Sequence, residues 1–133
     1  MATDPSTDVR DDHEDVLGDL LPEDSVLTLE EYLDMQRAIG NETRFRILHV
    51  LKERGDMSAS DLAETLDLEA NNLHYHLDKL VDVGLVQNRK RKTADRDGLF
   101  SYYRATALGE GILEHGVEEL MRREHDFLER YGD

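Results

Sequence analysis

The stretch SASDLAETLDLEANNLHYHLDKLVDVG, residues 58 to 84, decides the fold of this chain. Ser58 followed by Asp61 has the form of a helix cap, and Gly84 has the form of a helix stop. Apolar side chains recur at helical spacing on both sides of the three-residue turn DLE. Two helices, residues 58–66 and 70–83, joined by a tight turn predict a helix-turn-helix. The side chains expected to be buried are Leu62, Ala63 and Leu66 on the first helix and Leu73, Leu77 and Leu80 on the second.

The second of these helices has a polar face opposite its leucines. Asparagine can form two hydrogen bonds with adenine, and tyrosine and histidine can reach phosphate or the edges of bases. A solvated polar face is the simpler explanation, but it does not account for a helix, a turn and a basic hairpin occurring together. The candidate groove residues are Asn71, His74, Tyr75 and Asp78, with Asn72 and Lys79 at the edges.

A β-hairpin is expected over residues 85–105. The runs LVQNRKRKT and LFSYYRAT are strand-like, and the segment between them contains the turn signal Asp97-Gly98. Residues 87 to 104 hold six cations and two acids, a net charge of +4 in an acidic chain. The hairpin is therefore a candidate wing that contacts DNA phosphates through Arg89, Lys90, Arg91, Lys92 and Arg96.

The segments on either side complete the expected organisation. Residues 1–27 form an acidic tail, which we expect to be disordered because nine acids face one arginine in its first 24 residues. Helices are expected between Thr28 and Gly40 and between Asn41 and Gly55, and residues 28–106 make up the winged domain. Residues 107–133 are expected to form one long helix whose apolar stripe is covered by a second copy of the chain. The predicted dimer interface consists of Leu33, Ile112, Val117, Leu120, Met121 and Leu128.

The amino-acid composition indicates where in the cell the protein is expected to work. The chain has 133 residues, no cysteine and a formal net charge of −15. The absence of cysteine excludes disulfides and thiolate metal sites, and no apolar run or signal peptide is evident, so we expect a cytoplasmic protein without membrane contact. An excess of acids over cations, 31 to 16, is typical of proteins that stay solvated in a salt-rich cytoplasm.

The segment GNETRFRILHVLKERGDMSASDLAETLDLEANNLHYHLDKLVDVGLV resembles the winged helix-turn-helix of the ArsR-type transcriptional regulators. The resemblance covers roughly residues 40 to 111, and NETRFRIL and HLDKLVDVGLVQNRK are its most specific parts. It implies a mainly α fold with a small β-hairpin, and a homodimer that binds a pseudo-palindromic site in double-stranded DNA. The implied groove contacts are Ala70, Asn71, Asn72, His74 and Tyr75, and His76 is expected to pack or hydrogen bond rather than read bases. With the acidic composition, the resemblance suggests a haloarchaeal member, with an oxidative-stress role as a narrower hypothesis.

Three alternatives have weaker support. The metal-sensing branch of the family uses paired cysteines, which are absent here, and His115 and His125 lie ten residues apart and so face different sides of one helix. No metal or other cofactor is therefore expected, and the chain lacks the phosphate loops and nucleophile motifs of enzymes. A winged helix that binds a protein partner is the main competitor. If DNA is the ligand, potassium or other cations are expected to bridge surface carboxylates and phosphates.

Overall fold

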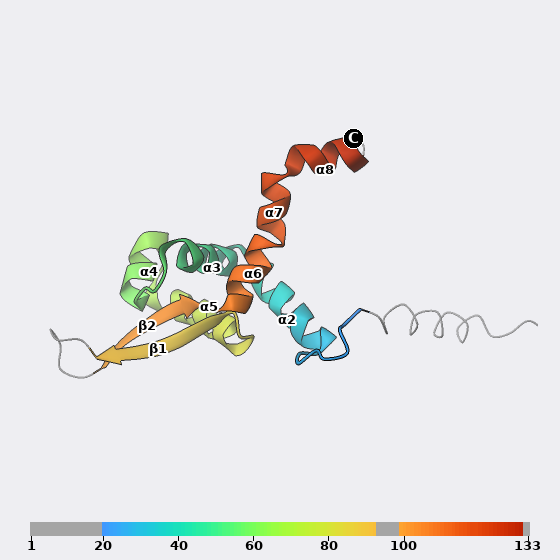
Figure 1. Ribbon diagram of the computed structural model, residues 1–133. Helices are drawn as coiled ribbons and strands as arrows, with labels where there is room; N and C mark the ends of the chain where they lie inside the picture. The colour runs from blue at the N-terminus through green and yellow to red at the C-terminus, as the bar shows by residue number, and fades with distance from the viewer. Residues whose placement is uncertain (1–19, 93–98, 132–133) are drawn as a thin grey trace, which may run out of the picture. The chain divides into compact units, whose positions relative to one another are not determined.

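The computed structural model describes residues 20–92 and 99–131. The chain divides into two units, residues 1–33 and 34–133. Figure 1 labels the helices and the two strands along the chain. The elements are α2 (Leu29–Ile39), α3 (Glu42–Arg54), α4 (Ala59–Leu66), α5 (Ala70–Asp82), β1 (Val86–Lys92), β2 (Leu99–Ala105), α6 (Ala107–Glu114), α7 (Val117–Arg122) and α8 (Glu124–Tyr131).

The described part of the first unit contains turns followed by the start of α2. The Thr28 amide donates to Glu31 Oε1 at 2.9 Å, and the Glu31 amide donates to Thr28 Oγ1 at 3.1 Å. This reciprocal pair is the capping box expected from the sequence. The acidic tail predicted for residues 1–27 lies mostly outside the described residues.

The second unit has its core between α3, α5 and the segments that follow. Helix α3 begins at Asn41, whose side chain accepts from the Arg44 amide at 3.0 Å, and ends at Gly55 with a φ of 86°. Both ends match the sequence-based expectation. The fully buried side chains of the unit are Ile47, Leu48, Leu51, Leu62, Leu73, Leu77, Leu80, Leu85, Val86 and Leu113.

Helices α4 and α5 form the predicted helix-turn-helix. Ser58 Oγ accepts from the Asp61 amide at 3.1 Å at the start of α4. Helix α4 ends at Asp67, whose positive φ of 54° starts the turn. All three leucines of the predicted stripe on α5 have an exposed fraction of 0%. Their complete burial fixes which face of α5 points outward.

Strands β1 and β2 form the predicted wing. They pair antiparallel, with Val86 opposite Ala105 and Lys92 opposite Leu99. The segment before α4 joins this hairpin, because Met57 exchanges two backbone hydrogen bonds with Tyr103, at 3.0 and 2.7 Å. The wing is therefore tied to the helix-turn-helix by main-chain bonds. Residues 93–98, which include the predicted turn and Arg96, lie outside the described residues.

The prediction of one long helix over residues 107–133 is wrong, because the segment forms three helices, α6, α7 and α8 (Figure 1). The first break falls at Gly116, where a Cβ would lie 2.4 Å from the carbonyl oxygen of Ile112. The Arg122 side chain donates to the Glu114 carbonyl at 3.1 Å and so satisfies one acceptor at the end of α6. The second break falls at Arg123, between α7 and α8.

Helix α6 packs closely on the chain where α5 leads into β1. Thr106 caps it, with its hydroxyl donating to the Gly84 carbonyl at 2.7 Å and accepting from the Gly109 amide at 3.0 Å. Gly109 is buried, and a Cβ there would lie 2.2 Å from the Leu85 carbonyl oxygen. Only glycine allows this approach of helix to backbone.

We predict that Gly109→Ala lowers the free energy of unfolding by about 1–3 kcal/mol, because the methyl group overpacks the contact with Leu85. Gly111→Ala is the matched control, since a Cβ there meets nothing within 4 Å and alanine favours the helix by roughly 0.5–1 kcal/mol. Urea denaturation measures both. Equal effects of the two substitutions would show that the close approach does not constrain the fold.

Candidate nucleic-acid interface

The outward face of α5 carries the residues predicted to meet DNA. Ala70, Asn71, Asn72, His74 and Tyr75 are all exposed, as are Asp78 and Lys79. Tyr75 is the largest of them, with 56% of its surface exposed. The exposed side chains thus offer amide, imidazole and phenol groups to one side of the helix, and contact with bases remains a prediction.

Tyr75 is held by its neighbours on α5. The Lys79 ammonium lies 5.4 Å from the centre of the Tyr75 ring, within the range of a cation–π interaction. The His76 ring meets the tyrosine edge-on, with centroids 5.1 Å apart. These contacts limit the directions in which the phenol can point.

His76 is buried and hydrogen bonded, as expected from the sequence. Its Nδ1 lies 3.1 Å from Arg44 Nη1, and because arginine only donates, Nδ1 is the acceptor. Burial and the charge of Arg44 lower the pKa of His76, which favours the neutral imidazole that this bond requires. His76 therefore supports α5 from behind and does not face a ligand.

Arg44 is a residue whose role the sequence did not reveal. Its Nε donates to the Ala38 carbonyl at 2.7 Å, so one guanidinium links the end of α2, the first turn of α3 and α5. Arg44 is the first arginine of NETRFRIL, and the sequence gives no other indication of its role. Its partners, Ala38 and His76, lie 6 and 32 residues away along the chain. Spacing along one helix does not predict such contacts.

The four consecutive cations of β1 differ in their contacts. Arg89, Lys90 and Lys92 are exposed on this strand. Arg91 instead lies over the Tyr102 ring, with its guanidinium carbon 4.3 Å from the centroid, and its Nη2 is 3.8 Å from an Asp56 carboxylate oxygen. Arg91 thus covers a buried tyrosine in addition to carrying charge, which makes Lys90 the better probe of wing charge alone.

Four of the five predicted dimer residues of the C-terminal segment are exposed. Leu120, Met121 and Leu128 are 52%, 61% and 55% exposed, and Val117 is also exposed. Ile112 is half-buried on α6, whereas its neighbour Leu113 belongs to the core. In the other unit, Leu33 is exposed on α2. Their role in a dimer stays a prediction.

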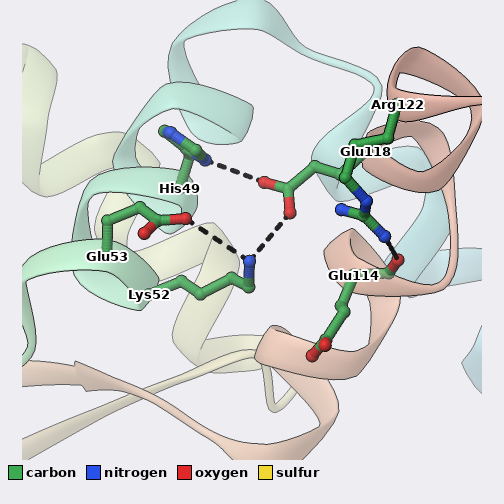
Figure 2. A network of polar contacts seen from close by, with 6 residues as sticks. All are labelled: His49, Lys52, Glu53, Glu114, Glu118 and Arg122. Atoms are coloured by element: carbon green, nitrogen blue, oxygen red, sulfur yellow. Dashed lines mark hydrogen bonds and ion pairs between the residues drawn. The ribbon is translucent and has the colours of Figure 1, made fainter.

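A polar network joins α7 to α3 (Figure 2). Glu118 is buried, and it accepts from Lys52 Nζ at 2.9 Å and from His49 Nδ1 at 2.8 Å. Burial alone would raise the pKa of Glu118, but the hydrogen bonds and charges of Lys52 and His49 outweigh burial and lower it. The bond to Glu118 is the main cause that raises the pKa of Lys52. The start of α7 is therefore anchored to α3 by charge.

This network bears on the metal hypothesis for the C-terminal segment. A metal site on this segment would need carboxylate ligands beside the histidines, but the buried carboxylate of Glu118 is already bound to Lys52 and His49. Within residues 20–92 and 99–131, no group of three His, Cys, Asp or Glu side chains could hold a metal ion. In the same ranges, no helix is long and apolar enough to span a membrane.

We predict that Glu118→Ala lowers the free energy of unfolding at pH 7 on the order of 2 kcal/mol, less than the roughly 3–5 kcal/mol of a fully buried broken pair. Because the folded pKa is below the unfolded one, the stabilisation is complete above the unfolded value of about 4.3 and is lost as pH falls through the folded pKa. Glu119→Ala, in the adjacent and more exposed position, is the control. Denaturation midpoints of the three proteins between pH 7 and pH 3 test this, and parallel curves for wild type and Glu118→Ala contradict it.

Comparison with known proteins agrees with this architecture. Residues 39–88 match a family model described as a helix-turn-helix domain. The chain is 36% identical over 75 residues to transcription factor E of Ignicoccus hospitalis, a match that covers 56% of this chain and 43% of that protein. It is 31% identical over 75 residues to the arsenical resistance operon repressor of Bacillus subtilis, covering 56% of this chain and 66% of that protein. The chain thus spans less than two thirds of the length of these curated relatives.

A solved structure extends the match to the fold. The transcriptional regulator homologue protein from Pyrococcus horikoshii OT3 superposes with a TM-score of 0.58 at 26% identity, over 74% of this chain and 98% of that one. The hairpin that follows the helix-turn-helix completes the same architecture. The chain therefore has the winged helix-turn-helix fold seen in transcriptional regulators, and part of it is similar in sequence to the arsenical resistance operon repressor of Bacillus subtilis.

Proposed function

We propose that this protein is a sequence-specific DNA-binding transcriptional regulator that acts as a homodimer on a pseudo-palindromic operator. The exposed polar face of α5 beside the cations of β1 is the observation that carries the proposal. Bases are read by side chains on a helix in the major groove, and cations on a wing bind phosphates. The similarity to an arsenical resistance operon repressor supports the same class of activity.

Binding to a protein partner is the second candidate, and the charge of −15 favours it because that charge repels DNA. Selection of bound duplexes from a random library separates the two candidates. Enrichment of a two-fold symmetric motif supports the regulator, and absence of any enrichment supports the protein partner. Mapping bound sites in cells with and without oxidant extends the test to a stress role.

The acidic composition leads us to propose that the protein works in a salt-rich cytoplasm, as in a haloarchaeon. At molar salt the screening length is about 3 Å, and the release of counterions from DNA contributes little to affinity. Cations held between protein carboxylates and phosphates are a substitute source of affinity. Glu69 and Asp78 are exposed at the start and on the outer face of α5, and are the carboxylates best placed for this role.

We predict that Asn71→Ala costs about 1–3 kcal/mol on the selected operator and little on random DNA, because an amide that reads a base carries sequence information. Lys90→Ala should weaken binding to both duplexes similarly, since a phosphate contact does not depend on sequence. Fluorescence anisotropy with each duplex measures the losses. Equal losses from Asn71→Ala on the two duplexes contradict a base-reading role.

We predict a dimer in molar KCl that Leu120→Asp dissociates, because a charge buried in an apolar interface costs several kcal/mol. Leu108→Asp is the control, since Leu108 is also an exposed leucine but lies outside the proposed interface. Light scattering at micromolar protein gives the mass of each. A monomeric wild type, or dissociation by both substitutions, is incompatible with the proposed interface.

We predict that affinity for DNA stays flat or rises with KCl over part of the range from about 0.2 to 3 M, a range that spans the screening regimes. The double substitution Glu69→Gln and Asp78→Asn should restore the usual steep fall, because it removes the carboxylates that hold cations against the phosphates. Anisotropy titrations of both proteins test this. If the affinity of the wild type for DNA falls steeply as KCl rises, the acidic surface serves solubility alone and this prediction is contradicted.

A further inference from the structure

An open groove of about 370 Å³ runs beside α5, between that helix, the end of α2 and the first turn of α3. Three cations line it, Arg37, Arg44 and Lys79, against one acid, Asp34. Its charge is therefore positive in a chain whose formal charge is −15. A positive groove in such a chain marks a binding site for an anion.

The groove has one fixed wall. Arg44 is half-buried and held by its bonds to the Ala38 carbonyl and to His76, at 2.7 and 3.1 Å. A guanidinium restrained in this way adds positive potential without the entropic cost of ordering a long side chain. Arg37, which also lines the groove, is largely exposed and pairs with Asp34 one turn earlier on α2.

The groove is continuous with the outward face of α5. Tyr75 and Lys79 line it, and both also belong to the exposed set on that helix. A ligand here would touch the same tyrosine that faces the proposed DNA. The groove is open, and four of the seven residues that line it are charged, which suits one phosphate of a long backbone better than a small molecule that needs enclosure.

We propose that this groove binds a DNA backbone phosphate through Arg37 and Lys79, with Arg44 as a fixed positive wall. The proposal rests on the proposed function and adds a phosphate contact to those of the wing. Phosphate contacts from separate parts of a protein set the position and orientation of its recognition helix on the duplex. The Asp34 carboxylate shares the charge of Arg37 and would repel the phosphate, so it weakens binding.

Anisotropy with labelled duplexes, one of random sequence and one from the selection, tests the groove at KCl concentrations from about 0.2 to 3 M. At the concentration where the wild type binds most tightly, Arg37→Gln and Lys79→Gln should each weaken binding roughly tenfold on both duplexes. Asp34→Asn should strengthen binding. Arg123→Gln is the matched control, because Arg123 also pairs with an aspartate three residues away, at 3.6 Å, but lies between α7 and α8.

The outcomes separate this inference from the proposed function. If the wild type binds neither duplex, the proposed function itself is contradicted. A wild type that binds, with Arg37→Gln and Lys79→Gln behaving like Arg123→Gln, overturns the groove alone. Weaker binding by Asp34→Asn also overturns it, because a removed repulsion cannot weaken a phosphate contact. Inorganic phosphate that displaces DNA at micromolar concentration would make the groove an effector site and overturn it too.

Discussion

Burial of one leucine stripe on α5 is the constraint on which the rest of the structure depends. Leu73, Leu77 and Leu80 are completely buried, and each contributes about 1.5–3 kcal/mol relative to an exposed side chain. Any rotation of α5 about its axis would bring these leucines into contact with solvent. The leucine stripe therefore determines which face of the helix points outward. Arg44 and His76 then hold the helix from behind. The proposed reading surface follows from apolar burial, and no polar residue on that surface is needed to orient it.

Charge in this protein is organised locally. The chain as a whole is strongly acidic, yet β1 and the groove beside α5 are lined by cations. Inside the fold, the carboxylate of Glu118 meets Lys52 and His49, which anchors α7 to α3. The cations of β1 and of the groove lie where the proposed DNA would bind, so the net charge of the chain does not determine the charge of this surface. On the proposed function, this division explains how an acidic protein binds DNA.

Local chemistry made much of the fold predictable from sequence. The caps at Thr28, Ser58 and Asn41 and the stops at Gly55 and Gly84 depend on residues within one turn of each helix, and the structure has them as expected. Contacts between distant residues were not predictable. The links from Arg44 to His76 and from Glu118 to His49 join residues 32 and 69 positions apart. Periodicity also does not register the close approach of Gly116 to the Ile112 carbonyl oxygen, which leaves no room for a Cβ where the helix breaks. The exposed set on α5 was foreseen because helical periodicity alone determines which side chains oppose the leucines. The groove beside it was not, because three elements must meet to form it.

Amide NMR of the protein with a selected duplex in molar KCl tests most directly whether DNA lies on α5 and the wing. We expect chemical-shift changes to concentrate in residues 70–79 and in β1, and to be smaller with a random duplex of equal length. Changes confined to α7 and α8, or identical changes with both duplexes, would contradict it.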